Sequence, residues 1–143
     1  MVNLLKRLQK EFNLTVIFIS HNLSLVKYIS DRIGVMYLGS MVELAPADSL
    51  YETPSHPYTV ALMSATSIPD PQLQRKRSLI ELEGDIPSPI NTLNGACFFL
   101  GRCPYTNKAC KNKIVSLQEV GKNHLATATV YRKERGRQYE FVS

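Results

Sequence analysis

Several features are missing from this sequence of 143 residues, and each absence narrows the class of protein. No apolar run approaches the roughly 20 residues that a membrane-spanning helix needs, so no transmembrane span is predicted. Neither an internal repeat nor a low-complexity segment is present. Cysteine is scarce, with three residues in all. An odd number without a secretion signal argues against a disulfide framework.

The composition is that of a folded chain. An apolar fraction of 44% can supply a core, and the length suits one domain, or one domain with a small appendage. The chain is therefore expected to be soluble and intracellular. The formal charge of +5 is compatible with nucleic acid, an anionic membrane or an acidic partner. The basic residues gather in the last third, as a solvated tail would show: Lys108, Lys111, Lys113, Lys122, Arg132, Lys133, Arg135 and Arg137.

Apolar spacing predicts the first elements. An amphipathic helix ends near Asn13, with its apolar residues one turn apart. These residues are Leu4, Leu5, Leu8 and Phe12. Residues 15–19 form a continuous apolar run, which is typical of a parallel-sheet strand covered on both faces. Helical spacing returns over residues 23–29, with Asn22 as its N-cap.

A hairpin and two helices are predicted next. Strands at 33–38 and 41–44 flank the turn signal Gly39-Ser40. Pro46 suits the first turn of a helix over 46–52. A further helix opens at residues 55–57. Its apolar side is expected to carry Tyr58, Ala61, Leu62 and Ala65.

The character of the sequence changes after residue 66. Prolines and Gly84 mark an extended region, in which a strand at 79–82 is predicted. Further short strands are predicted at 115–120 and 126–131. We place a boundary near residue 66, which divides the chain into 1–66 and 67–143.

His21 is the first candidate for chemistry. It follows the apolar run directly, and ligands in open parallel sheets bind beyond the carboxyl ends of the strands. An imidazole can donate a hydrogen bond, and a helix N-terminus favours negative charge, so the position suits a phosphate. The alternative is a capping or packing histidine.

Four blocks of the sequence carry a family resemblance. Residues 19–43, I-S-H-N-L-S-L-V-K-Y-I-S-D-R-I-G-V-M-Y-L-G-S-M-V-E, resemble the distal part of an ABC-transporter ATPase domain. The blocks H-P-Y-T at 56–59, G-D-I-P-S-P-I-N at 84–91 and R-C-P-Y at 102–105 resemble the oligopeptide/dipeptide importer subfamily. The resemblance implies an α/β fold, the distal part of a P-loop ABC ATPase core followed by a small irregular α+β extension.

The resemblance also gives His21 a role. It implies the switch histidine, which contacts the γ-phosphate of ATP and helps to position the attacking water. Asn22, beside it in the phosphate region, stands where this family usually has Asp. Asn can still cap a helix, but any charge-dependent role of the position does not carry over.

The rest of an ATPase site is absent from the sequence. G-x-x-x-x-G-K-[ST] (Walker A) does not occur, no apolar strand ends in Asp-Glu (Walker B), and the L-S-G-G-Q signature is missing. ATP and Mg²⁺ are the cofactors implied for the full-length family. We expect this chain alone neither to bind ATP well nor to hydrolyse it. It is interpreted as a fragment whose strand 15–19 has lost its neighbours, and such unpaired edges favour association.

The cysteines Cys97, Cys103 and Cys110 have the spacing C-x5-C-x6-C, which is not that of a zinc finger. The resemblance implies a [4Fe–4S] cluster whose fourth cysteine lies in an H-x-x-x-C arrangement. The matching histidine is His124, but Ala128 stands where the cysteine is expected. Three interpretations stay open: a cluster completed by His124 or water, a zinc site, and reduced thiols in a packed loop.

Two neighbouring blocks are given structural roles. His56 is expected to cap or bridge the turn that opens the H-P-Y-T block, with Tyr58 packed beside it. Residues 87–89 fix an extended path. Residues 98–100, Phe-Phe-Leu, depart from the basic-aromatic stretch that contains H-P in the family.

The predicted function is a fragment of the ATP-binding subunit of a peptide importer, which couples ATP hydrolysis to peptide uptake in the full assembly. The implied partners are a second ATP-binding subunit, membrane permeases and, indirectly, a peptide-binding receptor, at the cytoplasmic face of the membrane. One alternative is a basic, cysteine-containing module that binds nucleic acid. It lacks a known motif, and only Tyr131 and Tyr139 lie among the basic residues of the tail. Another is a remnant without activity.

Overall fold

The computed structural model describes residues 2–65, 80, 82, 84, 96–106, 108–111, 116–127, 130–132 and 139–141. Of the predicted strand 79–82, only Ile80 and Leu82 are described, and neither is in a strand. The block 84–91 lies outside the described residues except for Gly84. No helix in the described part of the chain is long and apolar enough to cross a membrane.

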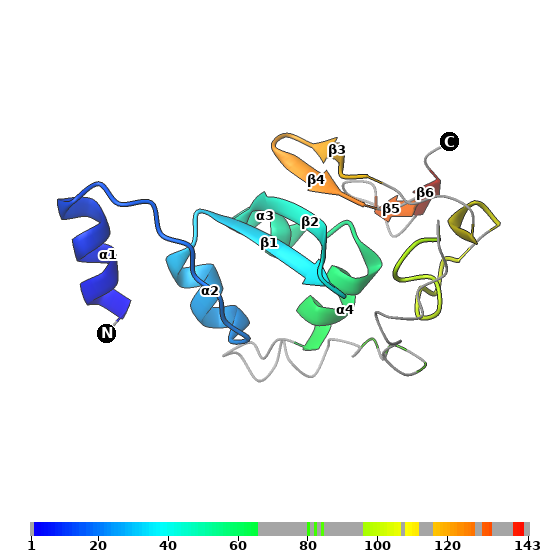
Figure 1. Cartoon of the computed structure of the whole chain (residues 1–143), viewed down its shortest axis with the longest axis horizontal. Coiled ribbons are helices and arrows are strands. Elements are labelled where there is room, and N and C mark those ends of the chain that lie inside the picture. Colours follow the sequence, from blue (N-terminus) through cyan, green and yellow to red (C-terminus); the bar gives the residue numbers. More distant parts are fainter. Residues whose placement is uncertain are drawn as a thin grey trace.

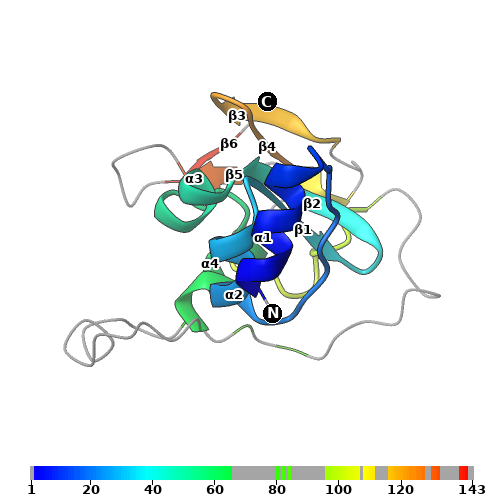
Figure 2. The same cartoon turned by 90° about the vertical axis from the view of Figure 1, so that its left-hand side faces the viewer.

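Helix α1 (Val2–Glu11) lies at one end of the molecule, beyond α2 (Leu23–Ile29) (Figures 1 and 2). It ends as predicted, because Asn13 takes a left-handed φ of 49° that a regular helix cannot continue. No residue of α1 is buried. Two contacts connect it to Tyr28 of α2. The Tyr28 hydroxyl donates to Asn3 Oδ1 at 3.2 Å, and Lys6 Nζ lies 4.0 Å from the centroid of the Tyr28 ring.

The segment between these helices corrects the predicted strand at 15–19. Residues 14–20 belong to no strand. Ile17 and Ile19 are 89% and 92% exposed. A strand exists only when another backbone pairs with it, and no described segment does so here. Residues 15–19 therefore have the composition of a buried strand, but no described strand pairs with them.

Helix α2 agrees with its prediction. Asn22 Oδ1 accepts a hydrogen bond from Leu25 N at 3.1 Å, so Asn22 is the N-cap. Val26 and Ile29 are buried, and Leu23 packs against the core.

Strands β1 (Arg32–Tyr37) and β2 (Ser40–Pro46) form the predicted hairpin. Leu38 and Gly39 both have positive φ, 47° and 79°, as the tight turns of two-residue hairpins require. Alternate side chains of β1 are buried. Gly34 allows close packing within the hairpin, because a Cβ there would lie 2.8 Å from Met41 Sδ.

The sheet is completed from the far end of the chain. Strand β4 (His124–Ala126) pairs with β2, and β3 (Gln118–Gly121) pairs with β4. All pairings are antiparallel, in the order β1-β2-β4-β3. The described residues thus form a small α/β structure with an antiparallel sheet, and the parallel pairing predicted for residues 15–19 is not found among the described strands. Short two-residue turns join antiparallel neighbours, whereas the run that predicted parallel pairing stays unpaired.

Two helices follow the hairpin. Helix α3 (Ala47–Glu52) starts after Pro46, and α4 (Pro57–Ala65) starts in the H-P-Y-T block. The predicted inner face of α4 was partly wrong. Ala61 is buried, and Tyr58 and Leu62 are partly buried against the core, as predicted. Ala65 is exposed, and the fully buried residues of α4 are Pro57, Thr59, Ala61 and Met63.

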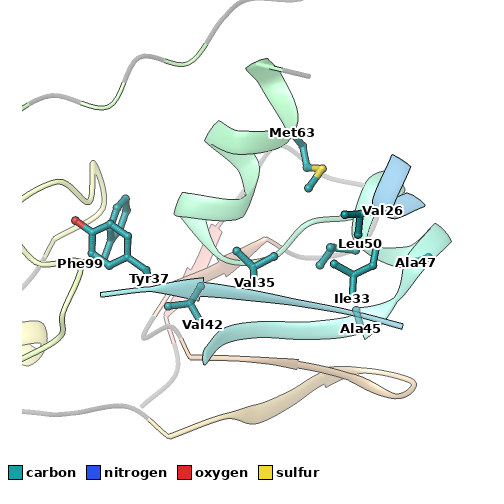
Figure 3. Close-up of a cluster of buried hydrophobic side chains, with 10 residues drawn as sticks. All are labelled: Val26, Ile33, Val35, Tyr37, Val42, Ala45, Ala47, Leu50, Met63 and Phe99. Atoms are coloured by element: carbon teal, nitrogen blue, oxygen red, sulfur yellow. The ribbon is translucent and has the colours of Figure 1, made fainter. Parts of the chain in front are cut away.

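The core lies between the β1–β2 hairpin and the helices (Figure 3). Leu50 and Ala45 are fully buried in it. Phe99 closes one end, 1% exposed, with its ring edge-on to Tyr37 at 5.1 Å. Residues 98–100 therefore depart from the family pattern in a way that serves packing.

The remaining described elements are short. A single 3₁₀ turn, η2 (Ala109–Lys111), contains Cys110. Strands β5 (Val130–Arg132) and β6 (Tyr139–Phe141) pair with each other as a separate ribbon. The strand predicted at 115–120 corresponds to β3, a few residues later. The range predicted as one strand, 126–131, holds the end of β4 and the start of β5.

Candidate functional site

His21 lies on the surface, directly before α2. Asn22 N donates to Ser20 Oγ at 3.0 Å, which fixes the turn that presents the imidazole. His21 is exposed and lines an open pocket of about 450 Å³. Arg32, at the start of β1, lines the same pocket. A histidine and an arginine are both donors that can meet an anion, so the surroundings are compatible with the predicted phosphate role.

A second cluster is built around Glu43, which the sequence analysis did not single out. Glu43 is fully buried in β2. Its Oε1 accepts from Ser55 N at 2.7 Å, and its Oε2 accepts from His56 N at 2.9 Å. His124 Nε2 and Glu43 Oε1 form a hydrogen bond at 2.6 Å. We call these four residues the Glu43 cluster.

The turn before α4 explains why an acid is needed there. The first N–H groups of a helix have no partner within the helix, and a carboxylate at this end also meets the positive end of the helix dipole. Glu43 supplies the two acceptors from a neighbouring strand. His124 brings β4, from the far end of the chain, to the same carboxylate.

His56 caps α4, as predicted. Its Nδ1 accepts from Tyr58 N at 3.1 Å, so this nitrogen carries no proton. Burial lowers the pKa of His56 from 6.5 to about 4, although Glu43 and a hydrogen bond with the backbone of Thr127 raise it. The imidazole is therefore neutral near pH 7 and serves the fold.

Cys97 and Cys103 lie in the loop that carries Phe99, and Cys110 lies in the 3₁₀ turn η2. Cys97 N donates to Cys110 O at 2.9 Å, and no disulfide joins the three. Burial raises the pKa of the Cys97 and Cys103 thiols, and the neighbouring thiols raise it further. Burial thus favours the protonated form of the Cys97 and Cys103 thiols.

His124, the predicted fourth ligand, lies elsewhere. Its Nε2 is bonded to Glu43, and the ring is buried in β4. Within the described ranges, no group of three or more His, Cys, Asp or Glu side chains is arranged to hold a metal ion. With Ala128 at the fourth cysteine position, the residues present do not fit a four-ligand iron–sulfur cluster.

One signal could have revealed Glu43. It interrupts an otherwise apolar strand, V-E-L-A, where a buried charge is tolerated only with partners. The partners come from residues 12 and 81 positions away, so the pattern could not name them.

Known proteins share this part of the sequence. The family model for the oligopeptide/dipeptide transporter, C-terminal region, matches residues 42–110, a range that includes Glu43 and all three cysteines. The Bacillus subtilis protein YkfD is 52% identical over 131 residues, which are 92% of this chain and 40% of YkfD.

Two further relatives are named oligopeptide transport ATP-binding proteins. The oligopeptide transport ATP-binding protein AppF of Bacillus subtilis is 46% identical over 91% of this chain and 39% of its own length. The oligopeptide transport ATP-binding protein OppF of Salmonella typhimurium is 55% identical over 76% of this chain and 32% of its own length. The chain thus spans less than half the length of each. It belongs to the oligopeptide transport ATP-binding family and corresponds to the C-terminal portion of its members.

Proposed function

We propose that this chain acts as the C-terminal portion of the ATP-binding subunit of an ABC-type peptide importer, with His21 facing the γ-phosphate of ATP. The observation that carries the proposal is the place of His21. It is an exposed imidazole, held by a capped turn at the rim of an open pocket that it shares with Arg32.

His21 can do one part of the chemistry. Its N–H can donate to a phosphate oxygen, and donors aimed at developing charge lower the barrier of phosphoryl transfer. A phosphate-binding loop, a lysine and acidic ligands for Mg²⁺ have to come from the portion of the subunit that this sequence does not contain. When bound, ATP and Mg²⁺ would supply the transferred group and the charge neutralisation.

The proposal includes an assembly, which the resemblance to peptide importers implies. A second ATP-binding subunit and membrane permeases would be the partners, with a peptide-binding receptor reached indirectly. The place of work would be the cytoplasmic face of the membrane. The division at residue 66 remains part of the proposal as a sequence division, although the pairing of β2 with β4 crosses it.

The test joins this chain to the missing portion. The C-terminal portion of AppF is replaced by residues 2–143, and ATP hydrolysis is measured. The isolated chain should show no turnover above that of its His21→Ala variant. The fused protein should hydrolyse ATP, and His21→Ala should reduce its rate by about 100-fold or more.

A control variant separates this effect from general damage. Lys111→Ala changes an exposed residue in the 3₁₀ turn and should leave the rate unchanged. A fused protein that folds and binds ATP, but whose rate is insensitive to His21→Ala, would contradict the proposal.

A further inference from the structure

The three cysteines carry chemistry that the proposed function does not use. They do not fit a four-ligand cluster, because His124 is bonded to Glu43 and Ala128 stands at the fourth cysteine position. In the part of the chain that the structure describes, no group of three or more ligating side chains is arranged around a metal ion. Neighbouring thiols have a second reaction open to them, which is to form a disulfide with each other.

The backbones of Cys97 and Cys110 lie against each other. Cys97 N donates to Cys110 O at 2.9 Å. The N–Cα bond, this hydrogen bond and the carbonyl group limit the distance between the two Cα atoms to about 6.8 Å, even if all of them lay on one line. Disulfides join Cα atoms that are about 4.4–6.8 Å apart. This pair is therefore within bonding range without a movement of the backbone.

The two thiols are neighbours as well. Burial raises the pKa of the Cys97 thiol, and the nearby Cys110 thiol raises it further, which requires the two groups to be close. Cys110 is 4% exposed, whereas Cys97 is half-buried. One thiol of the pair is thus inside the fold and the other is at its border.

Cys97 is the thiol of this pair that a reagent can reach. It lines an open pocket of about 250 Å³, together with Phe98 and Leu117. Cys103 is also half-buried, but its backbone is engaged in a local turn, because Thr106 N and Thr106 Oγ1 donate to Cys103 O at 3.3 and 2.8 Å. The geometry favours Cys97 as the attacking thiol and Cys110 as its buried partner.

We propose that Cys97 and Cys110 are a redox-active pair, which a low-molecular-weight disulfide such as oxidised glutathione converts to a reversible disulfide. The Cys97 thiolate attacks one sulfur of the reagent, whose S–S bond breaks and releases one thiolate. The Cys110 thiolate then attacks Cys97 Sγ and displaces the second reagent thiolate. Two protein thiols are oxidised, one reagent disulfide is reduced to two thiols, and the protons of the protein thiols end on these two.

The disulfide reinforces a segment that already anchors the fold. Phe99 lies within the loop that the bond would close, and its ring packs against Tyr37 in the core. A cross-link removes conformations from the unfolded chain and thereby stabilises the folded one. Oxidation should therefore raise the resistance of the chain to urea, and reduction should restore the starting state.

The experiment maps the bond in the full 143-residue chain. The native protein is incubated with oxidised glutathione at about pH 8.5, because the raised pKa of Cys97 slows the exchange at lower pH. Unreacted thiols are blocked with iodoacetamide, and the chain is digested with trypsin without reduction. Cleavage after Arg102, Lys108 and Lys111 places each cysteine in a peptide of its own.

Mass spectrometry then identifies the partners. We expect the peptide that contains Cys97 to be joined to residues 109–111, at a mass about 2 Da below that of the two thiol peptides together. Treatment with excess reduced glutathione should separate them again.

Serine substitutions give matched controls of one residue type. Cys110→Ser should abolish the cross-link and leave glutathione attached to Cys97, whereas Cys103→Ser should form the cross-link in the same yield as the unchanged chain. Oxidation should raise the urea midpoint of the unchanged chain and of Cys103→Ser by about 1 M, and it should not raise that of Cys110→Ser.

Three results would overturn the proposal. They are a cross-link that involves Cys103, glutathione that stays on Cys97 of the unchanged chain, and a cross-link that forms only after urea is added. The mapping itself needs no substitution, so it decides the question even if Cys110→Ser does not fold. No readout involves ATP, so this proposal and the proposed function fail separately.

Discussion

At the scale of single residues, Glu43 connects three parts of the chain. It accepts from two backbone N–H groups before α4 and is hydrogen-bonded to His124 in β4. Since the carboxylate is fully buried, its partners would stay in a dry interior without it. Unpaired buried donors and a broken buried ion pair are among the most costly defects in a protein.

Replacement of this residue should therefore be severe. Glu43→Gln keeps the shape but removes the charge and one acceptor, and it should lower the free energy of unfolding by about 3 kcal/mol. Urea unfolding followed by far-ultraviolet circular dichroism measures the change. Glu119→Gln, at an exposed position of β3, is the matched control and should cost less than about 0.5 kcal/mol. Equal effects of the two substitutions would contradict the role of Glu43.

The lowered pKa of His56 makes the free energy of unfolding depend on pH. Its pKa is lowered from 6.5 to about 4 in the folded state, so the unfolded chain binds more protons between these values. The neutral, buried His56 therefore contributes fully to the free energy of unfolding above pH 6.5, and this contribution is lost as the pH falls toward 4. It amounts to about 3 kcal/mol.

A substitution isolates this contribution from those of Glu43 and His124, which face the same cluster. His56→Asn retains an acceptor near the position of Nδ1, so it can still cap α4. Unfolding free energies are measured for both proteins from pH 4 to 8. The wild-type curve should fall more steeply below pH 6.5, and parallel curves would show that His56 does not titrate as described.

Residue-scale prediction succeeded where the partner is near in sequence. Asn22 and His56 cap the helices that begin beside them, and both roles followed from the local pattern. Glu43 and His124 meet across 81 positions. A pairing over this distance leaves no local pattern in the sequence. His124 was therefore interpreted as a ligand of a cluster held by the cysteines, and Glu43 was not singled out.

At the scale of elements, the same distinction holds. The helices and the β1–β2 hairpin form from neighbouring residues, and their bounds were close to those predicted. The pairing of β2 with β4 joins distant strands and was not foreseen. The run at 15–19 was predicted as a strand because its composition demands burial, but burial depends on a neighbour that the described chain does not supply.

Phe99 fixes the cysteine loop to the hairpin and helices. Its ring is 1% exposed and lies 5.1 Å from Tyr37 and 5.7 Å from Tyr58. Phe99→Ala should lower the free energy of unfolding by about 4 kcal/mol, because a cavity would open in the core. If this variant does not fold, Phe99→Leu should show a smaller loss of about 1 kcal/mol.

The adjacent aromatic residue provides the control. Phe98 is only partly buried, so Phe98→Ala should cost clearly less than Phe99→Ala. Labelling of the Cys97 and Cys103 thiols, followed over time in native buffer, checks the location of the effect. Faster labelling in Phe99→Leu than in Phe98→Ala is expected, and the opposite order would show that Phe99 does not anchor the loop.

At the scale of the whole molecule, the sequence predicts two parts that meet near residue 66, whereas the sheet joins strands from both parts. Helices α1 to α4 all precede residue 66, and all three cysteines follow it. Yet β4 completes the sheet against β2, His124 meets Glu43, and Phe99 enters the core. Each contact buries groups from both sides of the division, so neither side keeps its packing without the other.

This arrangement predicts one cooperative unfolding transition. Circular dichroism at 222 nm reports the helices of the first part, and thiol labelling reports the cysteine loop of the second. Because the core and the Glu43 cluster are shared, the two probes should give the same urea midpoint, within about 0.2 M. Glu43→Gln should lower both midpoints together. If the thiols became reactive at a clearly lower urea concentration than the helices unfold, the two parts would be separate folding units, and the contacts of Glu43 and Phe99 would be too weak to couple them.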